Sequence, residues 1–421
     1  MLPNNFAEAC TFAYATAHET ADKKDARDAK RGERWRIRRG MWYNVGMKIC
    51  AMKNSILVFV GLVAGIAAAN EPHAKGRLTL SFKESDPVGD FAEMKRRVPS
   101  SFDDKDDAGK DNPYNVSERT YSVEVPESYD KGKPAPLFVW ISATNGGGMQ
   151  GQLRESLAKR GFIYAGANGT GNEIWPPIRF RAAIDAVFNL KKLYNIDPKQ
   201  IFIAGNSGGG RCASMVSITY PDVFTGGGFY VIGCNFWDNL PSKKAGSYIP
   251  GFLKKRDKKL FDVAKKHYYV FLTGSKDFNR DGTIKAYYGY GKDGFRNCFY
   301  NETENLGHAT PPAADIEKAF AFLDRSLHPD AFAACEQAAK AVKAKRYAYA
   351  AKKLGPFRGT CAAVDDKWGE LVALADSETE KITSNAALKP KLRKLKLQGI
   401  VSKFGPVLGE KAKKALAEQA E

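Results

Sequence analysis

Histidine is scarce in this sequence, and no pair of cysteines has the spacing of a structural zinc site. The 421 residues include 5 histidines and 7 cysteines, with no C-x-x-C arrangement, which argues against a zinc-binding module. The one long uncharged apolar run, at residues 55–69, is shorter than the roughly 20 residues that span a bilayer as a helix. We therefore expect no metal site and no membrane-spanning helix once this run is removed.

That apolar run has the features of a secretory signal peptide. It reads SILVFVGLVAGIAAA, follows Lys48 and Lys53, and ends in small residues of the A-x-A kind. We predict a signal peptide at residues 47–69 and a secreted or periplasmic protein. Residues 1–46 are then an untranslated extension caused by a gene-start error, and a true extension carrying a signal anchor is the alternative.

An exported protein can form disulfides, and five cysteines follow the predicted cleavage site. An odd number leaves at least one thiol unpaired. We predict a Cys335–Cys361 pair, because both residues lie in one helical segment, and a Cys234–Cys298 pair.

The pattern of the remaining chain changes twice. Residues 70–113 are polar and charged and lack a sustained apolar period, which predicts a leader or linker. Between residues 114 and 327, short apolar strands alternate with helical patterns, which predicts an α/β domain with a doubly wound, mostly parallel sheet. Residues 328–421 are rich in Ala, Lys and Glu at helical spacing and predict a small all-helical domain. Expected elements include strands at 137–141, 201–205 and 268–274 and helices at 179–194 and 313–325.

A glycine-rich segment contains the candidate nucleophile. The apolar strand IFIAG runs into GNSGGGR, which puts Ser207 at the centre of a G-x-S-x-G motif at a strand-to-helix junction. In that context the motif predicts a tight elbow that presents the serine hydroxyl above the sheet. A loop that only turns the chain or cradles a phosphate is the alternative, but Arg211 and Cys212 stand where a phosphate loop would end in G-K-[S/T].

A serine nucleophile needs a base, and the chain offers few. His73 lies in the predicted leader, His267 heads a strand, and His328 ends a helix before a proline. His308, in NLGHATPP, follows a strand on a glycine turn and precedes a helix. We predict His308 as the base, in the chain order serine, acid, histidine.

The acid that orients this imidazole should lie on the same rim of the sheet. The strand YYVFLTG ends in SKDF, which places Asp277 past the carboxyl edge. Asp281 and Asp293 are the alternatives. Residues 277–282 also copy the first half of a calcium loop, but Tyr288 stands where that loop requires a bidentate glutamate.

An oxyanion needs two N–H donors. Gly208, directly after the nucleophile, supplies one, and the loop SATNGGG after the strand LFVWI supplies the other, from Ala143 or Thr144. That glycine run could instead be a flexible connection.

Three aromatic residues lie in loops after strands, namely Trp175, Phe236 and Trp237. Exposed rings at these positions would form a substrate-binding wall for a sugar or phenolic ring. Burial of the same rings as lid packing is the alternative.

Between residues 114 and 325, the chain resembles the α/β-hydrolase superfamily. The blocks VPESYD, YNIDPKQIFIAGNSGGGRCASMVSITYPDVF, TGSKDF and GHATPP look like those of secreted esterases grouped with polyhydroxybutyrate depolymerases and feruloyl or acetylxylan esterases. The resemblance implies a Ser207, Asp277 and His308 triad, acyl-enzyme chemistry and no cofactor. Many relatives have His-Gly at the oxyanion loop, where this chain has Ser142-Ala143.

Three functions stay open from the sequence. The first is hydrolysis of an ester of a polysaccharide, a phenolic acid or a polyester. The second is a serine peptidase of the prolyl-oligopeptidase type, although the residues between the predicted signal and the hydrolase domain are too few for a propeller.

The third is a non-catalytic protein that binds an anionic polysaccharide or cell surface through its basic tail. Residues 328–421 have 18 Lys+Arg against 11 Asp+Glu, within a net charge of +18 for the whole chain. No nucleic-acid-binding motif is recognisable, so nucleic acid is not an expected partner.

Overall fold

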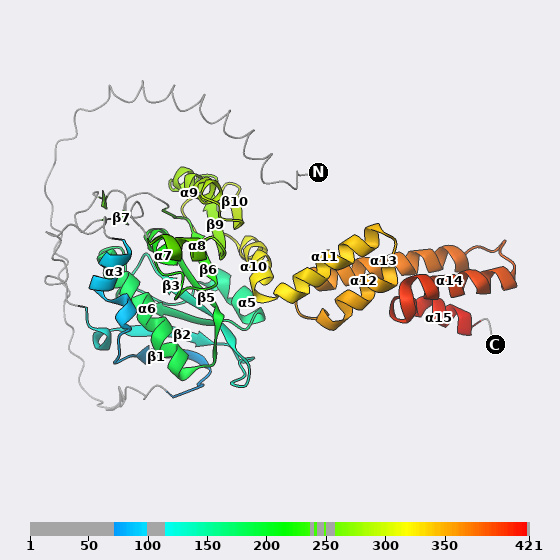
Figure 1. The fold of residues 1–421 in the computed structure, drawn as a ribbon, viewed down its shortest axis with the longest axis horizontal. Helices are drawn as coiled ribbons and strands as arrows, with labels where there is room; N and C mark the ends of the chain where they lie inside the picture. Colours follow the sequence, from blue (N-terminus) through cyan, green and yellow to red (C-terminus); the bar gives the residue numbers. More distant parts are fainter. Residues whose placement is uncertain (1–70, 99–113, 236–239, 242–247, 250–256, 419–421) are drawn as a thin grey trace, which may run out of the picture. The chain divides into compact units, whose positions relative to one another are not determined.

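A computed structural model describes residues 71–98, 114–235, 240–241, 248–249 and 257–418 (Figure 1). The predicted signal peptide and the preceding extension lie outside these ranges. The central feature is an eight-stranded sheet. In order across it lie β1 (Gly76–Ser81), β2 (Thr120–Val125), β4 (Ile163–Ala167), β3 (Ala135–Ile141), β5 (Ile196–Asn206), β6 (Gly227–Val231), β9 (Tyr268–Gly274) and β10 (Asn297–Thr303).

The sheet is mostly parallel, as predicted. From β4 through β10 every neighbouring pair runs parallel. At the other edge β2 is antiparallel to both of its neighbours, β1 and β4. The inner strands are buried on both faces, so β3 reads as the nearly unbroken apolar run APLFVWI.

Helices cover both faces of the sheet (Figure 1). Successive strand residues alternate between two hydrophobic clusters, with Leu137 in one and Phe138 in the other. One cluster includes residues of α3 (Phe91–Arg97), α6 (Pro176–Leu193), α7 (Gly208–Thr219), α8 (Lys258–Ala264) and α9 (Arg280–Lys292). The other includes residues of α5 (Gly151–Lys159) and α10 (Ala313–Leu327). The layers are those of a doubly wound α/β fold.

The prediction of a leader at 70–113 is wrong for residues 76–98. β1 adds an edge strand to the sheet beside β2, and Phe82 and Met94 are buried in the core. Asp185 of α6 accepts hydrogen bonds from the Ser85 hydroxyl and the Asp86 amide. An edge strand needs few apolar side chains because one of its faces meets water, so its sequence pattern is weak. Residues 99–113 lie outside the described ranges.

Neither predicted disulfide is present among the described residues: Cys335 is not bonded to Cys361, and Cys234 is not bonded to Cys298. Cys335 and Cys361 do not share a helix, because one lies in α11 (Pro329–Lys343) and the other precedes α13 (Ala362–Thr383). The Cys335 thiol donates to the Ala363 carbonyl, with 3.7 Å between sulfur and oxygen. Burial raises the pKa of Cys298 to about 12, which holds that sulfur as a neutral thiol.

The C-terminal residues form the predicted set of helices. These are α11, α12 (Tyr347–Leu354), α13, α14 (Pro390–Leu408) and α15 (Glu410–Ala417). They share one hydrophobic cluster of their own. Among the described residues, no helix is both long enough and apolar enough to cross a membrane.

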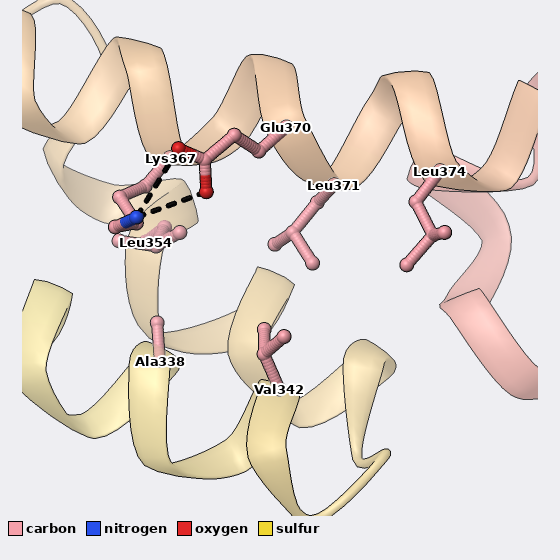
Figure 2. Close-up of a pocket in the computed structure, with 7 residues that line it drawn as sticks. All are labelled: Ala338, Val342, Leu354, Lys367, Glu370, Leu371 and Leu374. Carbon is pink, nitrogen blue, oxygen red and sulfur yellow. Dashed lines mark hydrogen bonds and ion pairs between the residues drawn. The ribbon is translucent and has the colours of Figure 1, made fainter. Parts of the chain in front are cut away.

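A cavity of about 230 Å³ lies among these helices. Leu371 and Leu374 of α13 point toward Ala338 and Val342 of α11 across it (Figure 2). No residue that lines it belongs to the predicted catalytic set. The cavity is thus a feature of the helical part and not of the catalytic site.

His267, just before β9, should make stability depend on pH. Its buried Nδ1 has no hydrogen-bond partner among the residues that the structure describes, and burial, with a contribution from Lys266, lowers its pKa to about 4. An unfolded histidine binds its proton near pH 6.5, so the unfolded state takes up a proton that the folded state excludes. This contribution to the free energy of unfolding is present above pH 6.5, and about 2 to 3 kcal/mol of it should be lost as the pH falls to 4.

Urea unfolding at a series of pH values measures this loss. In His267→Gln the free energy of unfolding should fall less between pH 6.5 and 4 than in the wild type. Parallel curves of this free energy against pH for the variant and the wild type would contradict the role of His267.

Candidate active site

Ser207 stands at a strained turn between β5 and α7. Its backbone lies at φ 51° and ψ −122°, a region that non-glycine residues rarely adopt. The Ser207 amide donates to the Val231 carbonyl at 2.8 Å. A Cβ on Gly205 would lie 2.5 Å from the backbone of Gly209, and one on Gly209 would lie 2.0 Å from the Ile141 carbonyl oxygen. Glycine is therefore required on both sides of the serine.

The three predicted triad residues meet in one hydrogen-bonded chain. His308 Nε2 lies 2.8 Å from Ser207 Oγ, and His308 Nδ1 lies 2.8 Å from Asp277 Oδ1. The Asp277 side chain is 0% exposed and that of His308 is 25% exposed. When Nδ1–H donates to the carboxylate, Nε2 is left to accept the serine proton. The arrangement can activate a hydroxyl nucleophile.

Asp277 is held by further donors just after β9. The Thr273 hydroxyl donates to Oδ2 at 3.1 Å, and the Asn279 amide donates to Oδ1 at 2.9 Å. A buried carboxylate needs such partners. The alternatives Asp281 and Asp293 make no hydrogen bond to His308, and the Asp281 side chain is 95% exposed.

The segment that copies the first half of a calcium loop runs directly into a helix. Residues 280–292 form the helix α9, and Tyr288 lies within it. The Asp277 carboxylate is hydrogen-bonded to the His308 imidazole. Over the described ranges, no group of three or more His, Cys, Asp or Glu residues is placed to hold a metal ion.

A polar network behind the acid was missed by the sequence analysis. Arg211 donates from Nη2 to Asn279 Oδ1 at 2.6 Å and from Nη1 to Asn235 Oδ1. Asn279 Nδ2 donates to the Ile232 carbonyl at 2.9 Å. These bonds join the nucleophile helix α7 to the loop that carries Asp277. The one feature of the sequence that pointed to this network was Arg211, directly after the glycine run.

Of the predicted oxyanion donors, Gly208 directly follows the nucleophile and Ala143 bonds to the residue before it. Gly208 begins α7, where the first N–H groups have no acceptor within the helix. The Ala143 amide donates to Asn206 Oδ1 at 3.2 Å, and the Thr144 amide donates to Ser142 Oγ at 3.1 Å. Both candidates for the second donor are thus bonded to side chains in this structure, so the choice between them stays a prediction.

Asn172 is a further residue that sequence reasoning missed. A Cβ on Gly208 would lie 2.1 Å from Asn172 Oδ1 and 3.0 Å from its Nδ2. The Asn172 amide donates to the Ala143 carbonyl at 3.0 Å, which ties it to the predicted oxyanion loop. The Asn172 side-chain amide therefore lies against Gly208, and any side chain at position 208 would have to displace it.

The aromatic residues are placed differently from the predicted wall. Trp175 is 7% exposed, and its ring centroid lies 5.1 Å from that of Phe91, which matches the packing alternative. Phe236 and Trp237 lie outside the described residues. Phe278, which was not predicted, is 77% exposed and stacks on the His308 imidazole with 4.0 Å between ring centroids.

No protein-family model matches this chain, and no curated protein matches it. Among solved structures it is similar to a fungal esterase from Rhizomucor miehei at 15% identity and a TM-score of 0.36, over 50% of this chain and 78% of the other. A bacterial heroin esterase is 18% identical at a TM-score of 0.36, over 50% of this chain and 80% of that one. A puromycin-hydrolysing peptidase of Mycobacterium tuberculosis is 18% identical at a TM-score of 0.38, over 50% of this chain and 37% of the peptidase.

The fold follows from the order of the strands and the positions of the site residues along it. Ser207 comes directly after β5, Asp277 follows β9, and His308 follows β10. All three therefore lie at the carboxyl ends of parallel strands, where doubly wound sheets place their sites. With this strand order and a serine elbow at the centre of the sheet, the described residues between 76 and 327 have the α/β-hydrolase fold.

Proposed function

We propose that this protein is a serine ester hydrolase that works through an acyl-enzyme. The observation that carries the proposal is the pair of 2.8 Å contacts that joins Ser207 Oγ, the His308 imidazole and the Asp277 carboxylate. Ser207 Oγ attacks the ester carbonyl carbon while His308 Nε2 takes the hydroxyl proton. The carbonyl π electrons move to the oxygen, which accepts a hydrogen bond from the Gly208 amide.

The same imidazole completes both halves of the reaction. As the ester C–O bond breaks, His308 returns the proton to the leaving alcohol, and the acyl group stays on Ser207. A water molecule then attacks the acyl carbon and gives its proton to His308, which passes one to Ser207 Oγ as the carboxylic acid leaves. Asp277 orients the ring and stabilises the imidazolium in each half. None of these steps requires a cofactor.

The position of Phe278 favours a substrate ester whose leaving group or acyl group has an apolar surface. One face of the ring covers the catalytic imidazole, and the ring is largely exposed. An aromatic face of this kind can stack on a phenolic or sugar ring or pack against a polyester chain. We therefore propose esters of polysaccharides, phenolic acids or polyesters as the substrate class, hydrolysed outside the cytoplasm after export by the predicted signal at 47–69.

A panel of substrates tests the proposal and separates it from the peptidase alternative. The full chain is assayed on p-nitrophenyl acetate, acetylated xylan, methyl ferulate and polyhydroxybutyrate, and on peptide p-nitroanilides, with Ser207→Ala as the blank. We expect kcat/KM to be highest for one of the esters. A higher kcat/KM for a peptide anilide, or ester rates equal to those of the blank, would reject an esterase.

A further inference from the structure

The first half of α14 exposes apolar side chains on the side that faces away from its own core. Leu397, Ile400 and Phe404 of α14 are buried in the hydrophobic cluster of the C-terminal helices. At 3.6 residues per turn, Leu395 lies on the opposite side of the helix. Leu392, three residues earlier, lies next to it. Their exposed fractions are 63% for Leu395 and 45% for Leu392.

Exposed lysines frame these two leucines. Lys391 and Lys394 fall on one side of the leucine pair and Lys396 on the other, and Lys389 directly precedes the helix. None of the four takes part in an ion pair with any residue that the structure describes. No aspartate or glutamate occurs between residues 381 and 409. This stretch of the surface is therefore basic with an apolar centre.

The arrangement does not stabilise the fold. Cations near the N-terminus of a helix oppose its dipole, and neighbouring like charges such as Lys391 and Lys394 repel each other. Elsewhere in the same helices lysines have acidic partners: Lys403 binds Glu378. The lysines around Leu392 and Leu395 lack such partners within the chain, so an external partner is the more direct explanation.

We propose that the first two turns of α14 bind the surface of an anionic lipid bilayer. The two leucines enter between the lipid headgroups, and the lysines on either side extend their ammonium groups to lipid phosphates. A polyanion without apolar parts, such as an acidic polysaccharide, would engage the lysines and leave both leucines in water. The inference does not rest on the proposed hydrolase activity.

Co-sedimentation of the full chain with vesicles tests the surface. Binding is expected to mixed phosphatidylcholine–phosphatidylglycerol vesicles, to fall as salt rises, and to be weak on phosphatidylcholine alone. The double variant Lys391→Gln/Lys394→Gln should weaken binding about 25-fold, at about fivefold for each lysine. Leu392→Ser/Leu395→Ser should weaken it at least about tenfold.

A matched control variant loses the same two positive charges at positions outside the proposed lipid-binding surface. Lys340→Gln/Lys343→Gln, at exposed positions of α11, should bind vesicles as the wild type does. An equal loss in this control would overturn the proposal, because net charge alone would then explain binding. Binding by the leucine variant at the wild-type level, with retention on an acidic polysaccharide, would also overturn it in favour of a polyanion.

A fluorescent reporter checks insertion without removing any contact. Leu395→Trp places an indole at the more exposed of the two leucines, which is 63% exposed. Because the chain already has 6 tryptophans, the emission of the wild type is subtracted from that of the variant. The difference spectrum should shift to the blue when anionic vesicles are added and stay unchanged with phosphatidylcholine. An unshifted spectrum in the presence of bound anionic vesicles would overturn the proposal.

Discussion

Ser207→Ala is expected to lower kcat for p-nitrophenyl acetate by about 10⁶-fold and to leave KM nearly unchanged. The Ser207 oxygen would form the covalent bond to the acyl group, and no other hydroxyl shares its 2.8 Å contact with His308 Nε2 in the described residues. Steady-state kinetics on matched preparations measure the loss. The small change in side chain leaves the positive φ at position 207 in place, so the variant should unfold at the wild-type temperature.

A serine outside the site provides the control. Ser326, near the end of α10, bonds to Gln200, and Ser326→Ala should keep the wild-type kcat. Ester hydrolysis by Ser207→Ala at more than about a hundredth of the wild-type rate would remove Ser207 from the mechanism.

Asp277→Asn should lower kcat by about 10⁴-fold. The Asp277 carboxylate accepts a hydrogen bond from His308 Nδ1–H at 2.8 Å and another from the Asn279 backbone amide. An amide group at position 277 can turn its NH₂ toward Nδ1, which moves the ring proton to Nε2. The imidazole then meets Ser207 with a proton already in place and cannot act as a base.

The matched control is Asp281, which the sequence kept as an alternative for the acid of the triad. Asp281 is exposed in the first turn of α9, so Asp281→Asn should keep kcat within about twofold of the wild type. If the two variants lose activity equally, or if Asp281→Asn loses more, the acid has been assigned to the wrong residue.

Local sequence was enough to place the serine and its strand. The run IFIAGNSGGGR specifies a buried strand, a turn too tight for side chains and a following helix, all within a few residues of Ser207. His308 and Asp277 each follow a strand in chain order, so the parallel sheet alone brings them to the same edge.

Other features depend on contacts between residues far apart in the sequence. The buried Trp175 packs against Phe91, which lies in a segment too polar to be recognised as part of the fold. The bond from Arg211 to Asn279 joins residues 68 positions apart, and no motif links them. The exposure of Phe278 and the approach of Asn172 to Gly208 depend on how loops from separate strands meet, which periodicity does not encode.

The cysteine pairs failed for a related reason. Two cysteines in one helical sequence pattern are expected to lie close together only if the pattern forms a single helix. Cys335 and Cys361 belong to separate helical segments. Residues 277–282 copy half of a calcium loop, whereas the residues from Arg280 onward form the helix α9.

Covalent labelling tests most directly whether Ser207 is the nucleophile of a hydrolase. A fluorophosphonate reacts with an activated serine, forming a P–O bond as fluoride leaves, and mass spectrometry of the digested protein locates the adduct. We predict a single adduct on the peptide that contains Ser207, with esterase activity lost in step with labelling and no label on His308→Asn. An active protein that stays unlabelled at Ser207, or one that loses activity while labelled elsewhere, would contradict the account.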